Sequence, residues 1–390
     1  MNRSVILFGA SDSRHLYNYI SIVLKDTAKF GDITIFNVAH ISDTPREFAD
    51  YYKKRGITIN NPQFTFRNIR GALKSICNFT ERTIALSRLL RKNKYDYAII
   101  HYCSWQAMRW VSLFCQHFSH IIPVFWGGDV LRNKKVNASY CRKVYSASDC
   151  IVLPNANSLK VFNKKTCNSF EDKSILIQFP QKMVSAFIAA EKTMPSNKDV
   201  KGEYGFPQDK LIVICGHTAT RAERYEQMID ELRKLPTDTF NKCYFVFMMT
   251  YAPEEYRTYQ VEIEHLIDTY NIPGCVLKEY LNYEQIQKLH SISDIHITNI
   301  QTDALSCFLQ EEMLAGSVLI YGKWLKYLDI ETPDFYAIPF EGIDLLANTL
   351  EEVISDFENH KAKSKINRNG IINLASEEII SSEWNKILVS

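Results

Sequence analysis

Several features that define common protein classes are missing from this sequence of 390 residues. No apolar stretch approaches the roughly 20 residues that a transmembrane helix needs, and the apolar run Val5–Phe8 is too short for a signal peptide. The ten cysteines include no Cys-x-x-Cys pair, and most lie in apolar runs, which favours buried, reduced thiols over zinc sites or disulfides. Gly-x-Gly-x-x-Gly is absent, which argues against an NAD-binding fold. We therefore expect a cytoplasmic globular protein.

Acidic residues are scarce in the first half of the chain and abundant in the second. Residues 1–185 contain 27 Lys and Arg against 12 Asp and Glu, whereas residues 186–390 contain 19 against 32. The balances of +15 and −13 support two domains and suggest that the first meets an anionic partner. Residues 67–94 hold eight basic residues and one acidic residue among apolar ones, which favours an anionic membrane surface. Nucleic acid lacks any supporting motif, and a solvated helical face remains the alternative.

Near-continuous runs of Val, Ile, Tyr and Phe predict parallel strands that are covered by helices on both faces. Six candidates lie in the first half and six in the second. The first six are Val5–Gly9, Ile33–Val38, Tyr97–Tyr102, Ile121–Trp126, Cys150–Pro154 and Ile175–Phe179. The second six are Leu211–Gly216, Tyr244–Thr250, Cys275–Tyr280, Asp294–Ile300, Ser317–Tyr321 and Phe335–Pro339. This alternation predicts an α/β protein with two doubly wound parallel sheets.

The predicted domain bounds follow from where the chain becomes polar and rich in helix breakers. That segment ends at residue 206, and we place a linker over residues 186–206. A Rossmann-like N-terminal domain over 1–185 precedes it, and a Rossmann-like C-terminal domain over 207–365 follows. Residues 366–390 form a terminal segment that is helical again.

The most informative segment is Asp294–Gly322, which has the pattern of a strand, a short polar loop, a helix and a second strand. Thr302 or Asp303 would cap the helix, and Gly316 stands where the C-cap is expected. Asp303 and Glu311 are eight residues, or about two helical turns, apart. The helix N-terminus would face the carboxyl edge of the sheet, where phosphates bind readily. The alternative is that Asp303 only caps the helix and that Glu311 is a solvated residue.

This segment resembles GT-B glycosyltransferases, above all the retaining, family 4-like enzymes with a Glu-x7-Glu motif closed by Glu-x-Met-x-x-Gly. Here Asp303-x7-Glu311 is followed by Met313 and Gly316, with Asp in place of the first Glu. The resemblance implies a GT-B fold with a cleft between an acceptor-binding first domain and a nucleotide-sugar-binding second domain. It also implies that the terminal helix crosses back to the first domain. Glu311 would bind the donor's ribose hydroxyls and Asp303 the transferred sugar, as a catalytic residue. The loop between them would supply donor contacts from Thr302, Ala304, Leu305 and Ser306.

Basic residues near two other strand ends of the second domain are candidates for the donor diphosphate. After Leu211–Gly216 come His217, Arg221 and Arg224, which would make charge-assisted contacts. In the resembled enzymes a loop like the one after Cys275–Tyr280 lies along the base, and Lys278 would reach a phosphate. The alternatives are an ordinary exposed helical turn and a solvated lysine.

In the first domain, Trp126–Asp129 follows the fourth strand and is similar to a loop near the reacting sugar in bacterial GT-B enzymes. Gly127 and Gly128 let the backbone approach a ligand, and Asp129 is expected at the cleft edge as a second catalytic candidate. A glycine turn in which Asp129 caps the next helix is the alternative. Further contacts to the acceptor or sugar are expected from Gly9, Ser11, His101 and Trp105.

Asp-x-Asp, the pair that holds a metal on the donor in the other common glycosyltransferase fold, does not occur in this chain. We therefore expect no metal and no cofactor, with helix dipoles and basic residues neutralising the diphosphate.

The predicted function is sugar transfer from a UDP-, GDP- or TDP-linked donor to a glycan or polyprenyl-diphosphate-linked acceptor, in bacterial surface polysaccharide or glycoconjugate biosynthesis. The place would be the cytoplasm or the inner face of the cytoplasmic membrane, with no nucleic-acid partner. The rivals are a nucleotide-sugar epimerase of the same fold and a non-catalytic basic membrane-binding protein. Retention or inversion of the anomeric configuration stays open, because Asp129 would be the base of an inverting enzyme.

Overall fold

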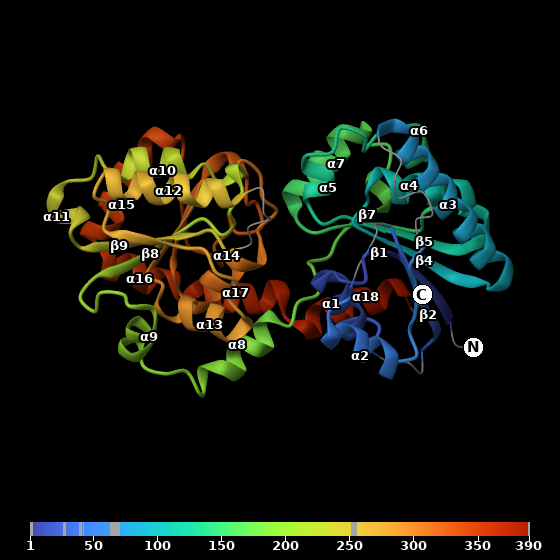
Figure 1. Cartoon of the computed structure of the whole chain (residues 1–390), viewed down its shortest axis with the longest axis horizontal. Coiled ribbons are helices and arrows are strands. Elements are labelled where there is room, and N and C mark those ends of the chain that lie inside the picture. Colours follow the sequence, from blue (N-terminus) through green and yellow to red (C-terminus); the bar gives the residue numbers. More distant parts are fainter. Residues whose placement is uncertain are drawn as a thin grey trace. The chain divides into compact units, whose positions relative to one another are not determined.

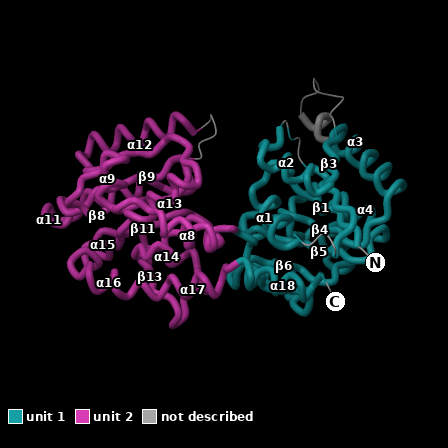
Figure 2. The backbone as a smooth tube through the Cα atoms, turned by 90° about the horizontal axis from the view of Figure 1, so that it is seen from below, with its two compact units in different colours: residues 1–181, 377–390 teal, residues 182–376 magenta. Residues whose placement is uncertain are grey.

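The computed structural model describes residues 3–25, 29–38, 41, 43–62, 71–250 and 256–388. It contains two compact units (Figures 1 and 2). Unit 1 comprises residues 1–181 and 377–390, and unit 2 comprises residues 182–376. Each unit is built on its own parallel sheet with helices on both faces. No helix in these ranges combines the length and apolar character needed to cross a membrane.

Unit 1 contains a seven-stranded sheet in which every strand pair is parallel. In spatial order the strands are β3 (Thr58–Asn60), β2 (Phe30–Asn37), β1 (Arg3–Gly9), β4 (Tyr95–His101), β5 (Phe118–Val124), β6 (Ile151–Leu153) and β7 (Ser174–Leu176). The order reverses between β1 and β4. The central strands are buried on both faces, as expected for a parallel sheet between two helical layers.

Helices cover both faces of this sheet and enclose two apolar cores. They are α1 (Arg14–Ile22), α2 (Arg46–Lys54), α3 (Gly71–Lys92), α4 (Trp105–Phe114), α5 (Gly128–Leu131), α6 (Ser139–Ala147), α7 (Ala156–Thr166) and α18 (Glu377–Leu388). One core contains residues of α1, α2 and α18, and the other contains residues of α3, α4, α6 and α7.

Unit 2 repeats the plan with six parallel strands. In spatial order they are β10 (Gly274–Leu277), β9 (Cys243–Met248), β8 (Leu211–Cys215), β11 (Ile295–Thr298), β12 (Val318–Gly322) and β13 (Ala337–Phe340). The order reverses between β8 and β11. Alternate residues of β11 serve opposite faces, because Ile295 and Ile297 join one core while His296 and Thr298 point to the other side.

The helices of unit 2 also form two layers. One face carries α10 (Tyr225–Leu232), α12 (Arg257–Thr269) and α15 (Leu346–Ser355). The other carries α8 (Met183–Glu191), α9 (Asn197–Tyr204), α13 (Tyr283–Ile292), α14 (Cys307–Ala315) and α17 (Ile366–Ala375). The short α11 (Thr237–Phe240) and α16 (Phe357–Ser364) complete the unit.

The predicted fold class of two Rossmann-like parallel sheets is confirmed, and all twelve predicted strands are present. The strand that the sequence did not reveal is β3, which has three residues, lies at the edge and is largely exposed. Such a short polar edge strand carries no run of buried residues. Several predicted strands extended past their observed ends, because apolar residues such as Phe179 continue into loops that pack on the sheet edge.

The unit bounds differ from the predicted domain bounds in the segment assigned to a linker. Residues 186–206 hold most of α8 and all of α9, and both helices belong to unit 2. Ser196 caps α9 by accepting from the Asp199 amide, and Gly205 ends it in the left-handed conformation. Polar composition therefore reflected a short, well-capped surface helix. At the other end, the predicted terminal segment is divided: α17 lies in unit 2, and α18 lies in unit 1 (Figure 2).

Two places in this fold are suited to ligands by topology alone. In open parallel sheets, ligands bind outside the carboxyl ends of the strands where the strand order reverses. In unit 1 this edge is formed by the residues after β1 and β4, and in unit 2 by the residues after β8 and β11. These loops contain most of the residues that the sequence singled out.

Candidate functional site

The predicted strand–helix–strand unit is present as β11, α14 and β12, but α14 starts later than expected. The helix begins at Cys307, with Ser306 as N-cap, and ends at Gly316 in the left-handed conformation with φ 85°. Leu305 has a positive φ of 57°, a conformation that cannot continue a right-handed helix. Asp303 therefore lies in the loop, which corrects the expectation that it and Glu311 are two turns apart on one helix.

The Asp303 carboxylate organises the loop that leads into α14. Its Oδ2 accepts hydrogen bonds from the Ser306 amide at 2.8 Å and from the Tyr327 hydroxyl at 2.8 Å. Tyr327 is buried and comes from the segment after β12, so the bond ties the two loops together. Asp303 thus caps a turn rather than the helix itself. Thr302, Ala304 and Ser306 of this loop are partly exposed, whereas Leu305 is buried.

Glu311 and its neighbour Glu312 are both buried in the helical layer between α13 and α14. Glu311 Oε2 lies 3.1 Å from His290 Nε2, and Glu312 Oε1 lies 2.7 Å from His290 Nδ1. Ser317 donates a further hydrogen bond to Glu312. The alternative of a solvated Glu311 is therefore wrong. His290 and Glu312 were missed by the sequence, although a histidine on the apolar face of α13 opposite two adjacent glutamates was a usable signal.

The loop after β8 is arranged around the buried carboxylate of Glu223. Glu223 Oε1 accepts from the amides of His217 and Thr218 at 3.3 and 3.1 Å and from the Thr218 hydroxyl at 3.0 Å. Burial raises the pKa of Glu223, although His217 and the hydrogen bonds oppose the shift. Gly216 is required at the start of this loop, because its φ is 62° and a Cβ there would lie 2.5 Å from the Tyr225 hydroxyl.

The basic residues that were predicted to contact a diphosphate have protein partners here. Arg224 donates to the carbonyls of Asn299 and Ile300 and lies over the Trp324 ring, so it fastens the end of β11. Arg221 is more than half exposed and is paired with two glutamates of neighbouring helices, one of them Glu262 at 2.7 Å.

Lys278 forms an ion pair with Glu264. The His217 ring is largely buried, and its Nδ1 lies 3.1 Å from Glu223 Oε1 without hydrogen-bond geometry. Among the described residues, no three His, Cys, Asp or Glu side chains are arranged to hold a metal ion.

Within the described ranges, several buried polar atoms after β8 and along β11 and α14 have no hydrogen-bond partner, although such atoms are normally paired. They are Glu223 Oε2, Thr298 Oγ1, Asn299 Oδ1, Ser306 Oγ, Gln310 Oε1 and both ring nitrogens of His296. Most are oxygen acceptors or hydroxyls, which suits a ligand rich in hydroxyl groups. Burial lowers the pKa of His296 to about 4, so its ring is neutral near pH 7. The sequence did not reveal this polar set, because its members come from four separate segments.

In unit 1, Asp129 is buried rather than placed at the cleft edge. It is 2% exposed, and its two oxygens accept from the backbone amides of Trp126 at 2.8 Å and Cys103 at 2.7 Å. The reason is that α5 begins at Gly128, immediately before it, which turns the carboxylate back under the loop. Burial raises the pKa of Asp129 to about 6, although the backbone donors oppose the shift. Asp129 therefore joins the loops after β4 and β5.

Aromatic rings dominate the carboxyl edge of unit 1. The half-buried Trp126 packs against the rings of His15 at 4.7 Å, Tyr102 at 5.6 Å and Phe179 at 6.1 Å, measured between ring centroids. His101 is fully buried beneath them, and burial lowers its pKa to about 3. His15 and Phe179 were not predicted, since they lie on α1 and after β7, far from the motif in sequence.

The other predicted residues of this edge differ in accessibility. Gly9 and Gly127 are buried, and Gly127 has φ 98°, which favours glycine. Ser11 is buried and bonded to the side chains of Asn37 and Thr44. Gly128 and Trp105 are partly exposed, and the Trp105 ring lies 4.8 Å from the Lys135 ammonium.

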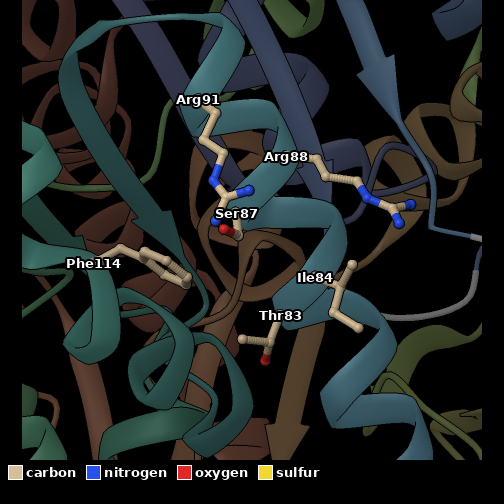
Figure 3. A pocket seen from close by; sticks show the side chains of 6 residues that line it. All are labelled: Thr83, Ile84, Ser87, Arg88, Arg91 and Phe114. Atoms are coloured by element: carbon tan, nitrogen blue, oxygen red, sulfur yellow. The ribbon is translucent and has the colours of Figure 1, made fainter.

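A surface hollow of about 400 Å³ lies on the basic helix of unit 1 (Figure 3). It is lined by Thr83, Ile84, Ser87, Arg88, Arg91 and Phe114. Arg88 and Arg91 are exposed and form no ion pair with any residue in the described ranges. Ile76 and Ile84 on α3 and Leu113 on α4 are exposed apolar side chains. Residues 67–70 of the predicted basic segment lie outside the described residues.

Neither models of known protein families nor curated protein sequences match this chain. Solved structures do match it over its whole length. HepE from Anabaena in complex with UDP is 11% identical, with a TM-score of 0.74 and coverage of 99% of both chains. Sucrose-phosphate synthase from Thermosynechococcus elongatus is 12% identical, with a TM-score of 0.73 and coverage of 99% of this chain and 98% of that one. A UDP-forming trehalose-phosphate synthase from Burkholderia xenovorans is 12% identical, with a TM-score of 0.71 and coverage of 100% and 99%.

At these identities the likeness establishes the fold. The chain has the GT-B fold, with two Rossmann-like units built on seven and six parallel strands. The predicted membership in the family with the Glu-x7-Glu motif, and the roles of the individual residues, remain predictions.

Proposed function

We propose that this protein is a glycosyltransferase that moves a sugar from a nucleotide-sugar to an acceptor. The observation that carries the proposal is that two loops follow the strands at the strand-order reversal of unit 2. One loop is arranged around Glu223, and the other is held by Asp303 and leads into α14, which carries Glu311 in its second turn. That edge offers carboxylates, hydroxyls and unpartnered acceptors where α/β sheets bind ligands. The structural neighbour HepE was solved with UDP and also with UDP-glucose, which supports a nucleotide-sugar as the donor.

In this proposal Glu311 accepts hydrogen bonds from the ribose hydroxyls, and Asp303 faces the transferred sugar. Asp303 Oδ2 is occupied by Ser306 and Tyr327, so its other oxygen is the one that remains for a ligand. The amides at the start of α14 and the Ser306 hydroxyl, which has no partner among the described residues, would contact the phosphates. Arg221 would have to exchange its glutamate partners for the diphosphate.

The acceptor belongs to unit 1 in this proposal. An aromatic surface around Trp126 is suited to the apolar faces of a sugar ring, and the neutral histidine beneath it adds no charge. We assign Asp129 the task of holding the Trp126 loop, since its carboxylate is committed to backbone amides. The acceptor is a glycan or a polyprenyl-diphosphate-linked glycan, of the kind used to build bacterial surface polysaccharides or glycoconjugates.

We further propose that unit 1 meets the anionic inner face of a membrane through the hollow on α3. Arg88 and Arg91 form no ion pair among the described residues, and together with the Ser87 hydroxyl they suit a phosphate headgroup (Figure 3). The exposed Ile84 of the hollow, with the exposed Leu113 next to Phe114 in the chain, suits the boundary between headgroups and acyl chains. This contact would place a lipid-linked acceptor near the enzyme.

Catalysis is proposed to need no divalent metal, because the chain has no Asp-x-Asp and offers helix N-termini at the site. The proposal as a whole is tested by screening UDP-, GDP- and TDP-sugars for thermal stabilisation, then analysing products with glycan and lipid-linked acceptors. Transfer of the sugar with release of nucleoside diphosphate is expected. A product that keeps its nucleotide would indicate an epimerase, and no stabilisation by any nucleotide would contradict the proposal.

A further inference from the structure

His290 is completely buried and lies between two carboxylates, each facing a different nitrogen of its ring. Nδ1 is 2.7 Å from Glu312 Oε1, and Nε2 is 3.1 Å from Glu311 Oε2. A carboxylate accepts hydrogen bonds, so both ring nitrogens must carry a proton to satisfy both contacts. This geometry requires an imidazolium rather than a neutral imidazole.

The electrostatics of the cluster agree with that assignment. Burial by itself would lower the pKa of His290, but the charge of Glu312 and the hydrogen bonds that the ring donates to both glutamates raise it to about 9. Burial likewise acts to raise the pKa of Glu312, and the charge of His290 outweighs it, so that the pKa of Glu312 is lowered. His290 therefore carries a positive charge at neutral pH, inside unit 2 and between two carboxylates.

The two carboxylates are not equivalent. Glu312 is fully buried, and both of its oxygens are occupied, Oε1 by His290 and Oε2 by the Ser317 hydroxyl. Glu311 has one oxygen on His290, while its Oε1 has no partner in the described part of the chain. The Glu311 side chain is also 11% exposed, whereas the Glu312 side chain is completely buried. Glu312 therefore anchors the imidazolium, and Glu311 is the member that still offers an oxygen.

We propose that His290 is a positioning residue that fixes the Glu311 carboxylate, so that its free oxygen accepts hydrogen bonds from a ribose of the nucleotide. The inference rests on the proposed function, in which Glu311 is the ribose ligand. A carboxylate whose second oxygen is held by a cation loses little freedom when a ligand binds to the first. If the Nε2 proton is lost, a lone pair faces Glu311 Oε2 and the carboxylate is repelled from its position.

Other charged or titratable groups surround this cluster from several elements. They are His296 on β11, His217 after β8, Asp294 before β11, and Lys361 on α16. His296 is already neutral near pH 7, because burial lowers its pKa to about 4. Burial lowers the pKa of Lys361, so its titration can overlap that of His290 at alkaline pH. The test must therefore isolate the part of any pH dependence that belongs to His290.

Calorimetric titration with UDP from about pH 7 to about pH 10 makes that separation. We expect His290→Gln to weaken UDP binding roughly tenfold at neutral pH, the size of a lost charge-assisted hydrogen bond. Wild-type affinity should fall toward that of the variant as the pH rises through about 9. His265→Gln, the same change at an exposed histidine of α12, should follow the wild type. Titration of UDP itself or of Lys361 affects all three proteins and cancels in the comparison.

Glu312→Gln provides a second test that does not depend on the folding of the His290 variant. It removes one of the two charges that hold the proton, so the fall in UDP affinity should occur at a lower pH than in the wild type. An unchanged midpoint in Glu312→Gln, or a folded His290→Gln with wild-type affinity and pH profile, would show that His290 only joins α13 to α14. If the wild type binds none of UDP, GDP and TDP at any pH, the proposed function is overturned, and this inference with it.

Discussion

The carboxyl edges of the two sheets share one topology and have opposite chemistry. In both sheets the strand order reverses between two central strands, and polar loops follow these two strands. In unit 1 that edge is dominated by aromatic rings around Trp126, and the Asp129 carboxylate there is buried on backbone amides. In unit 2 the residues at and near it include Asp303, Glu311 and several acceptors that have no partner in the described part of the chain. The same sheet topology thus presents aromatic rings in unit 1 and hydrogen-bond acceptors in unit 2.

This difference shows how a repeated fold acquires two roles. Topology decides where a ligand sits, whereas the loop residues decide which ligand it is. Rings and neutral histidines suit a sugar face, and carboxylates suit hydroxyl groups. Charge separates the units further, since the first half of the chain carries +15 and the second −13. We therefore assign acceptor and membrane contacts to unit 1 and donor contacts to unit 2.

The largest expected effect is a loss of stability of unit 2 at alkaline pH. The pKa of His290 is raised from 6.5 to about 9 in the folded protein. Its contribution to the free energy of unfolding is therefore complete below pH 6.5 and is lost as the pH rises through about 9. A shift of this size corresponds to roughly 3 kcal/mol. Hydrogen exchange of peptides from α13 and α14, corrected for intrinsic rates, should show the change. His290→Gln should lack it; equal protection at about pH 7 and about pH 10 in the wild type would argue against the imidazolium.

Unit 1 should respond in a different pH window through Asp129. The pKa of Asp129 is raised from 3.8 to about 6 in the folded protein. Its contribution to the free energy of unfolding is therefore complete below pH 3.8 and is lost as the pH rises through about 6. Asp129→Asn removes this dependence, and it also turns an amide donor toward a backbone N–H, at a cost of about 1 to 3 kcal/mol. At pH 4 the variant should have a lower free energy of unfolding than the wild type. The difference between the two free energies should shrink by about 2 to 3 kcal/mol from pH 4 to pH 7, because the wild type loses stability over this range.

Guanidinium unfolding followed by tryptophan fluorescence measures this change, because four of the five tryptophans lie in unit 1. If the difference in free energy of unfolding between wild type and variant does not change with pH, the pKa of Asp129 is not raised by folding. Asp129→Asn should also bind UDP as the wild type does, since the donor is assigned to unit 2. A variant with wild-type stability and abolished turnover would instead restore the catalytic role that the Trp-Gly-x-Asp pattern suggested.

Charge reversal of Arg88 and Arg91 tests the membrane contact of unit 1. Each basic residue near an anionic surface contributes on the order of 1 kcal/mol, so the double change to Glu should weaken vesicle binding at least roughly tenfold. Flotation with vesicles containing phosphatidylserine, at low and high salt, measures the effect. The matched control is Lys160→Glu with Lys164→Glu, the same charge change on exposed positions of α7. Equal losses in both pairs would mean that net charge, rather than the hollow, governs binding.

The smallest effect is expected from removing divalent metal. If helix N-termini and protein donors neutralise the diphosphate, sugar transfer should continue unchanged in excess EDTA. The assay is release of nucleoside diphosphate with and without chelator. Loss of activity in EDTA that Mn²⁺ or Mg²⁺ restores would contradict this expectation and would call for a metal held jointly by the donor and the protein.

The sequence was sufficient for the fold and for the strand–helix–strand unit that forms part of the candidate site. Buried strand runs identified both sheets, and the Asp294–Gly322 pattern identified the strand–helix–strand unit. It was insufficient where the outcome depended on a single backbone dihedral. The positive φ of Leu305 moves the start of α14 to Cys307 and leaves Asp303 in a loop. A leucine in that conformation has no composition signal, since glycine or asparagine is the usual residue there.

The sequence also did not predict contacts between side chains and partners that lie far apart along the chain. Arg224 was a reasonable diphosphate ligand until the structure placed its guanidinium on carbonyls 75 and 76 residues away. His290 lies 21 residues before Glu311, and their contact follows only from the packing of α13 against α14. Period and spacing predict which face of a helix is buried, but they do not predict which buried polar groups meet there.

The central claim, that the acidic edge of unit 2 binds the donor nucleotide through Glu311, is tested most directly by calorimetric titration of UDP. The wild type should bind, and Glu311→Gln should bind at least roughly tenfold more weakly, since a charged acceptor for two hydroxyls is lost. Glu352→Gln, the same change at an exposed position of α15, should bind as the wild type does. Equal UDP affinity in the wild type and a folded Glu311→Gln would contradict the account.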